Sequence, residues 1–385
     1  MTELAPATVP AQPGGHVGRP PGTTSASRLP GWVPSWAMIT TRQLELRKRR
    51  GLMIAVIVLT VGLTVLFLGV RLLFHAFDPA TYGPAGNPGI FSAVTGLIAE
   101  FGFIVAAALG ASAGTTDLTD GMFRHLVITG RSRLALYLAR IPAGLGIALP
   151  LVAVAFTMVC LVTSFAGTPD AKTVQFGSAF VSGRGPQVVR SVSVPGQLDE
   201  TQLGAWALAH PQQAEVAFPS GSTSVPASQL RSVIDRQLPT IYSAYVSAEI
   251  QVTNPPINEM IKIGLWLELD IGVGFLVGLG LGSLMGQRMV PTVLLIVLQI
   301  IITPLLASHV LPYFLDGQRL VFGIAMNQLR PAWLLGGNSG GLIRSGGPGA
   351  LQLPPMPTWA MVSVIVGWAV GWTGLGAWRM MTRDA

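Results

Sequence analysis

The chain has 385 residues, of which 50% are hydrophobic and only 11% are charged, and its net charge is +7. Soluble domains carry about 25% charged residues, so this composition argues against a soluble protein and predicts a membrane protein. The excess of Lys and Arg does not indicate nucleic-acid binding, because the sequence shows no soluble module with clustered basic and base-reading side chains.

The N-terminal region changes character twice before the first long apolar run. Residues 1–31 are rich in Pro, Gly, Thr and Ser, so we expect a disordered cytoplasmic tail that cannot bury enough surface to fold. Residues 32–50 carry Trp32 and Trp36 and end in a basic cluster, which predicts a helix lying in the membrane interface. The first apolar run begins only near Gly51 and is long enough to span, so it does not resemble a cleaved signal peptide.

Six apolar runs are long enough to cross a hydrocarbon core of about 30 Å, which takes roughly 20 helical residues. They cover residues 51–74, 90–114, 134–165, 260–286, 290–311 and 358–379. The third run is longer than a straight span needs, and we expect Pro142 and Pro150 to kink it. The sequence therefore predicts an all-α polytopic membrane protein with six transmembrane helices, three within 51–165 and three within 259–385.

Basic residues gather in the short connections on one side of the predicted bundle, which keeps those connections in the cytoplasm. They are Arg42, Arg47, Lys48, Arg49 and Arg50 before the first span, Arg124, Arg131 and Arg133 after the second, Arg288 after the fourth, and Arg379 and Arg383 after the sixth. We therefore expect a plasma-membrane protein with both termini in the cytoplasm.

Two segments on the opposite side interrupt the membrane pattern. Residues 166–258, between the third and fourth helices, are rich in Gly, Pro, Ser and Gln and contain short strand-like runs. They predict either a small extracytoplasmic domain or a partly ordered loop. Residues 312–357 are too polar to span but apolar enough to touch the membrane, so we expect an external re-entrant or surface helix there. The lone Cys160 lies inside the third run, which excludes an intramolecular disulfide.

No enzyme signature is present in the sequence. Lysine occurs only at Lys48, Lys172 and Lys262, and none of the three completes the GxxxxGK[ST] pattern that holds nucleotide phosphates. HExxH, CxxC and GxSxG patterns are also missing. We therefore predict no catalytic residue, no metal site and no cofactor bound by this chain.

Four charged residues fall inside the predicted spans. Glu100 lies near the middle of the second span, and Arg140 in the third is expected either to pair with it or to extend toward the cytoplasm. Glu268 and Asp270 belong to the fourth. A charge at the bilayer centre costs about 3 kcal/mol on insertion scales, so such residues face inward or find partners. They either line a polar translocation path or make ordinary contacts within the bundle.

Glycine recurs every fourth residue on one face of the fourth span, at Gly274, Gly278, Gly282 and Gly286. Small residues at this spacing let two helices approach closely. The pattern predicts helix packing, either within the chain or against a second subunit.

The connection at 115–133, between the second and third spans, is polar and basic. Asp117 and Asp120 suit the start of a short helix, and Phe123 forms an apolar edge beside Arg124. From these residues alone, the connection is either a docking helix for a cytoplasmic partner or a solvated loop.

This connection resembles the one between the second and third helices of ABC-2 type transporter permeases. There, an acidic residue, a glycine four positions later and a Ser-Arg pair lead into a helix with a basic residue. The matching residues here are Asp117, Gly121, Ser132, Arg133 and Arg140. The departures are Asp117 where Glu is usual, Met122 where Thr often stands, and Gly130-Arg131 where a Pro-containing pair is common. The insertion at 166–258 also lies outside the family's pattern.

The resemblance implies a permease subunit that pairs with a second permease, as a homodimer or heterodimer, and docks separate ATP-binding subunits. ATP and magnesium would be bound by those partners. Contacts with them would come from Arg124, Arg131 and Arg133, with Phe123 in a cleft, and export is the commoner direction in the family. Two alternatives stay open: an ion-coupled secondary transporter that uses the four intramembrane charges, and a non-transporting scaffold with an external binding domain. The sequence does not indicate the substrate.

Overall fold

The structure, a computed structural model, describes residues 33–119, 132–166, 173–176, 192–210, 254–305, 317–334 and 356–382, apart from residues 83, 197, 304, 318 and 332, together with separate positions between 231 and 245. In the membrane region its elements are α1 (Trp36–Lys48), α2 (Arg50–Ile57), η1 (Val58–Gly62), α3 (Leu63–Phe77), α4 (Pro79–Tyr82), α5 (Pro88–Thr119), α7 (Arg133–Leu138), α8 (Arg140–Ala166), α12 (Ile257–Met285), α13 (Met289–Ile296), η2 (Val297–Ile302), α16 (Phe322–Gln328) and α18 (Thr358–Thr382). Between α8 and α12 stand β1 (Thr173–Phe176), β2 (Val192–Pro195) and α9 (Glu200–Ala209).

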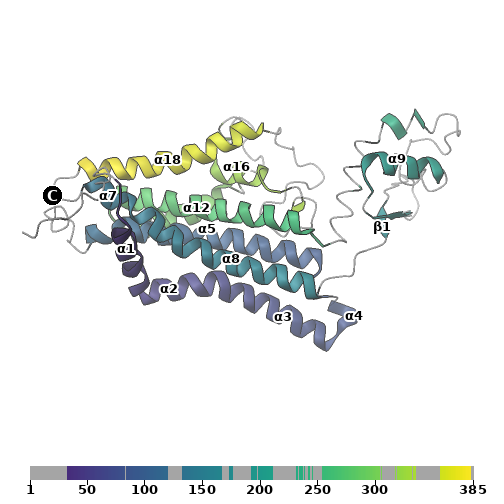
Figure 1. Cartoon of the computed structure of the whole chain (residues 1–385), viewed down its shortest axis with the longest axis horizontal. Helices are drawn as coiled ribbons and strands as arrows, with labels where there is room; N and C mark the ends of the chain where they lie inside the picture. The colour runs from purple at the N-terminus through teal and green to yellow at the C-terminus, as the bar shows by residue number, and fades with distance from the viewer. Residues whose placement is uncertain are drawn as a thin grey trace, which may run out of the picture.

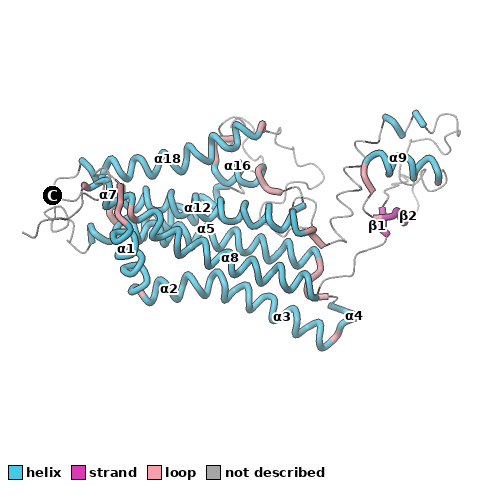
Figure 2. Tube along the Cα trace, viewed as in Figure 1, coloured by secondary structure: helices cyan, strands magenta, loops and turns pink. Residues whose placement is uncertain are grey.

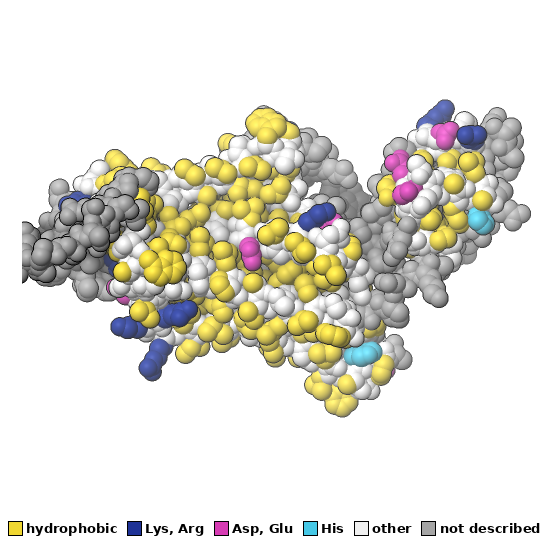
Figure 3. Space-filling model, viewed as in Figure 1, with side chains coloured by type: hydrophobic (Ala, Val, Ile, Leu, Met, Phe, Trp, Pro, Cys, Tyr) yellow, Lys and Arg dark blue, Asp and Glu magenta, His cyan; other side chains and the backbone are white. Residues whose placement is uncertain are grey.

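Five helices are long and apolar enough to cross a membrane: Arg50–Phe77, Pro88–Thr116, Arg133–Ala166, Ile257–Met285 and Thr358–Thr382. They run side by side in one bundle (Figure 1). Large apolar side chains are exposed along these helices, and Figure 3 shows how much of the bundle surface is apolar. Exposure of so large an apolar surface to water would be unfavourable, whereas the lipid of a bilayer can cover it. The predicted class, a mostly helical membrane protein, is confirmed.

The structure adds detail to the fifth and third predicted spans. The fifth apolar run contains the shorter helix Met289–Ile302, which is α13 continued by the π-helical η2, so the predicted span over 290–311 is not seen as one long helix in the described residues. In the third run the helix continues from α7 into α8 through Ala139, whose N–H donates to the Ala135 carbonyl at 3.0 Å, and then runs through Pro142 and Pro150. Pro142 has no N–H to donate to the Leu138 carbonyl, so one intrahelical hydrogen bond is missing at the junction of α7 and α8.

The glycine stripe of α12 packs against α5 within the same chain. A Cβ atom on Gly278 would lie 2.1 Å from the Ala107 carbonyl oxygen, and one on Gly282 would lie 2.6 Å from that of Ala111. The α5 helix also contributes a glycine to this contact: a Cβ on Gly110 would lie 2.1 Å from the Phe275 carbonyl oxygen. The two backbones are therefore in direct contact, which only glycine permits. The sequence left two partners open for this stripe, a helix of the same chain or a second subunit. The structure shows the first of these, packing within the chain.

The opposite face of α12 packs equally closely against α18. A Cβ on Gly280 would lie 2.2 Å from the Trp372 carbonyl oxygen, and one on Gly376 would lie 2.9 Å from the Gly280 Cα. The α12 helix is thus the centre of the bundle. Gly286, predicted to continue the stripe, has a different role: its φ of 69° ends α12 in the left-handed conformation that favours glycine.

The described chain begins and ends at the same end of the bundle, where α1, α7 and the end of α18 lie together (Figure 1). The α1 helix crosses this end and packs on α8, with the Gln43 amide donating to the Gly146 carbonyl at 3.4 Å. Its Trp36 is exposed. An exposed tryptophan on a helix at this position suits the predicted interfacial location.

The elements between α8 and α12 lie beyond the other end of the bundle (Figure 2). The strands β1 and β2 pair antiparallel, with Val174 opposite Val194. These valines pack with Leu203 of α9 and with Tyr245 in a hydrophobic core separate from that of the bundle, and the Tyr245 hydroxyl donates to the Pro195 carbonyl at 2.7 Å. Within the predicted insertion, the described residues therefore form a packed unit.

The start of α9 carries a pH-dependent cap. The Asp199 carboxylate accepts hydrogen bonds from the Thr201 hydroxyl and the Gln202 N–H, and these bonds hold the pKa of Asp199 below its ordinary value of 3.8. A lowered pKa means that the cap is fully present above pH 3.8 and is lost as the pH falls through the lower, folded value. Hydrogen exchange should therefore show faster opening of the α9 N-terminus at low pH. In the Asp199→Asn variant, whose cap does not titrate, opening should not change with pH.

Candidate functional site

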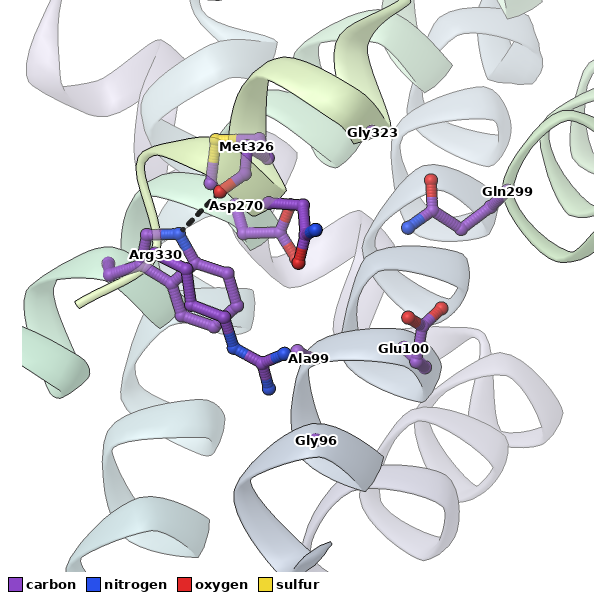
Figure 4. A pocket seen from close by; sticks show the side chains of 10 residues that line it. Gly96, Ala99, Glu100, Asp270, Gln299, Gly323, Met326 and Arg330 are labelled. Carbon is purple, nitrogen blue, oxygen red and sulfur yellow. Dashed lines mark hydrogen bonds between the residues drawn. The ribbon is translucent and has the colours of Figure 1, made fainter. Parts of the chain in front are cut away.

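A polar chamber of about 40 Å³ lies inside the bundle where α5, α12, η2 and α16 meet. Its lining residues are Gly96, Ala99, Glu100, Trp266, Asp270, Gln299, Gly323, Met326, Asn327 and Arg330. Figure 4 shows Glu100, Asp270 and Gln299 around one space, with the Arg330 side chain extending toward it. At roughly 10–15 Å³ per water, the chamber has room for about three water molecules and is far smaller than a pocket for an organic substrate.

The glycine contacts set the register that brings the two acids together. Gly278 faces Ala107 and Gly274 faces Phe103, so one turn earlier the same register places Asp270 beside Ala99, next to Glu100. Glu100 lies about 18 Å along α5 and Asp270 about 20 Å along α12, at 1.5 Å per residue. Both helices start at the same end of the bundle (Figure 1), so both acids lie at the same depth, near its middle.

Arg330 follows the short helix α16, which is held against the chamber by three contacts. The Trp266 indole N–H donates to the Met326 carbonyl at 3.1 Å, and the Arg330 guanidinium carbon lies 5.5 Å from the centre of the Trp266 ring. Gly323 lets α16 approach η2, because a Cβ there would lie 2.6 Å from the Thr303 methyl group. These contacts place a cation inside the bundle although α16 itself does not span it.

The chamber holds two acidic groups and one basic group. Glu100, Asp270 and Arg330 all line the chamber, but no ion pair within 4.0 Å joins these three side chains. The Arg330 Nε atom is buried and has no hydrogen-bond partner among the described atoms, and Asp270 is only 4% exposed. Gln299 brings a neutral amide into the chamber beside the two acids. With both acids ionised the chamber carries one net negative charge, so it can accept a proton or another single positive charge.

Only two of the four predicted intramembrane charges meet. Arg140 does not pair with Glu100: it is 2% exposed, and its Nη1 donates to the Gly114 carbonyl at 3.0 Å. Glu268 faces away from the chamber and lines an apolar groove between α8 and α12. The four residues therefore do not form one continuous path.

The predicted coupling residues are described only in part. Ser132 caps α7 by accepting from the Ala135 N–H at 3.2 Å, and the Arg133 Nη1 donates to the Met381 carbonyl at 3.1 Å. Asp120, Gly121, Phe123, Arg124 and Arg131 lie outside the described residues, and Asp117 belongs to α5 without a described side chain.

Sequence reasoning missed Gln299 and Arg330. Each carried a signal: Gln299 is a polar amide within the apolar run 290–311, and Arg330 ends the stretch FGIAMNQLR, which was expected to touch the membrane. A polar side chain in such a run points toward a partner inside the bundle.

Comparison with known proteins found no match among family models, curated proteins or solved structures. The class of the protein must therefore be inferred from the fold and the site. Together they define a helical membrane protein with a buried charged chamber at mid-bundle. Within the described residues no group of three or more His, Cys, Asp or Glu residues is placed to hold a metal ion.

Proposed function

We propose that the chain is the permease subunit of an ATP-driven transporter of the ABC-2 type, an exporter in the plasma membrane with both termini in the cytoplasm. The resemblance at 115–133 suggests the family. The observation that supports it is the way in which both ends of that connection are tied to the membrane helices. A segment that receives motion from an ATPase must be joined rigidly to the spans it moves.

The first end of the connection is tied to two neighbouring spans at Gly114. The Gly114 oxygen near the end of α5 accepts from Arg140 of α8 at 3.0 Å. A Cβ on Gly114 would lie 2.6 Å from the Leu279 carbonyl oxygen, so the backbone of α12 contacts α5 at the same point. Arg42, Glu45 and Leu46 of α1 line a small cavity with Arg140 and the end of α5. A displacement of the connection's first end would therefore reach α1, α5, α8 and α12 together.

The second end of the connection is tied to α18. Arg133 contacts Met381 of α18, as described above. In addition, the Tyr137 hydroxyl donates to the Thr373 carbonyl of α18 at 3.0 Å. Tyr137 is fully buried, so this contact is shielded from water. The connection at 120–131 thus bridges two anchored ends, as a coupling element requires. ATP hydrolysis would belong to separate subunits, since the sequence carries no P-loop pattern.

We expect Phe123→Asp to abolish the stimulation of the partner ATPase by this subunit, because a buried charge would prevent the side chain from entering an apolar cleft. The measurement is ATP hydrolysis by the reconstituted complex. Phe77→Asp is the matched control, since Phe77 is exposed at the end of α3, at the opposite end of the bundle. Stimulation that survives Phe123→Asp at the wild-type level would remove this connection from the mechanism.

The chamber favours a second candidate, a transporter driven by a cation gradient. Buried acids at mid-membrane are typical of proton and ion pathways, and Glu100 and Asp270 share one site here. The two candidates differ in their energy source. In proteoliposomes, the ABC permease requires ATP and its partner, whereas the alternative transports with a gradient alone and loses that transport in Asp270→Asn.

A further inference from the structure

A groove of about 370 Å³ runs along the outer surface between α8 and α12, apart from the chamber. Its lining includes Phe156 and Cys160 of α8 and Met260, Gly264, Leu265 and Glu268 of α12. This volume falls within the range of roughly 300–1,000 Å³ that holds drug-sized ligands. Leu265 is 62% exposed, so the groove opens sideways toward the lipid rather than into the bundle.

Glu268 is the charged residue of this otherwise largely apolar groove. It lies about 17 Å along α12, close to the middle of the span. Carboxylates at this depth face the bundle interior or pair with a cation. Glu268 does neither among the described residues: the lysine of the same helix, Lys262, is bound to Glu259 at 2.6 Å, and Glu268 forms no ion pair within 4.0 Å.

The floor of the groove is shaped for a ligand with an apolar body. A Cβ atom on Gly264 would lie 3.2 Å from the Phe156 ring, so the glycine lets this buried ring pack closely against α12 at the floor of the groove. A carboxylate within a largely apolar groove favours a ligand that carries a positive charge on an apolar body, that is, an organic cation. An apolar anion would meet the carboxylate and be repelled.

We infer that the groove between α8 and α12 binds a lipophilic organic cation that enters from the membrane, with Glu268 as its counter-charge. Phe156, Met260 and Leu265 would enclose its apolar part. Binding requires neither ATP nor a partner subunit. That the bound cation is also the transported substrate rests on the proposed function, so a failure of either idea can be recognised separately.

The test is equilibrium binding of radiolabelled tetraphenylphosphonium to the purified full-length chain in detergent. We expect saturable binding by the wild type, and a loss of affinity of about tenfold or more in Glu268→Gln, because the counter-charge is gone in a low-dielectric setting. Glu259→Gln removes one carboxylate from the same helix outside the groove and should bind as the wild type does. Tetraphenylborate, an anion of the same shape, should not compete.

A steric pair of variants separates the groove from non-specific partition into detergent. Leu265→Trp fills the groove from its exposed rim and should abolish binding, whereas Leu269→Trp, one turn away on the same helix and also exposed, should not. Both positions face outward, so the fold should persist, which size-exclusion chromatography and thermal melting would check. Absence of saturable binding, equal affinity in Glu268→Gln, or competition by tetraphenylborate would each overturn the inference. Dissociation of a dimer by Leu265→Trp without any cation binding would also overturn it and would assign the groove to a second copy.

Discussion

Replacing Gly278 with alanine should destabilise the protein more than any other single-methyl addition to the glycine stripe. The new Cβ would lie 2.1 Å from the Ala107 carbonyl oxygen, and both atoms belong to helices whose backbones are already in contact. Because backbone cannot rotate away as a side chain can, α5 and α12 must separate along their whole interface. We expect a loss of about 3 kcal/mol, the upper part of the range for overpacked cores. Thermal unfolding in detergent would measure it.

The matched control is Gly371→Ala, on α18. A Cβ at this position meets nothing within 4 Å, so the same chemical change should be neutral or slightly stabilising, because alanine lowers the conformational entropy of the unfolded chain. Equal melting temperatures for the two variants would contradict the close packing of α5 on α12. They would also remove the register that places Glu100 beside Asp270.

Replacing Arg330 with methionine is the second change that we expect to lower the stability of the protein strongly. Methionine keeps most of the apolar stem but leaves Glu100 and Asp270 without the cation that faces them across the chamber. Removing one partner of a buried charge cluster costs about 3–5 kcal/mol, because the remaining charges are uncompensated. Adding Asp270→Asn should recover part of this loss, since it restores the charge balance; the coupling in a double-mutant cycle should exceed about 1 kcal/mol.

Arg288→Met provides the control for losing a guanidinium. Arg288 is exposed in the turn between α12 and α13, where a charge contributes little to stability. If Arg330→Met melted at the same temperature as Arg288→Met, or if Asp270→Asn failed to rescue it, the three charged groups of the chamber would not act as a unit.

The sequence could predict the membrane class and the glycine packing because both rest on local patterns. Apolar runs of sufficient length predicted the five membrane-length helices, and the four-residue spacing predicted a close helix contact. The sixth predicted span, over 290–311, stays a prediction, because the helix Met289–Ile302 leads toward residues that the structure does not describe. Apolar length restricts where a span can lie without fixing where a helix ends.

The site was partly predictable. Glu268 and Asp270 are two residues apart, which is about 200° around a helix, so they had to face opposite directions. One belongs to the chamber and the other to the groove. The position of Arg330 could not be predicted, because it depends on how α16, only seven residues long, folds back against α12. Such a placement depends on tertiary contacts such as the one from Trp266 to Met326.

Identification of the partner subunit tests the proposed function most directly. Full-length chain should be purified by affinity from its native membrane in mild detergent, and whatever stays bound should be identified by mass spectrometry. We expect a stoichiometric soluble protein that carries the GxxxxGK[ST] pattern of an ATPase, which this chain lacks. A chain that is intact and monodisperse but reproducibly without such a partner would contradict the permease proposal and favour a transporter driven by a cation gradient.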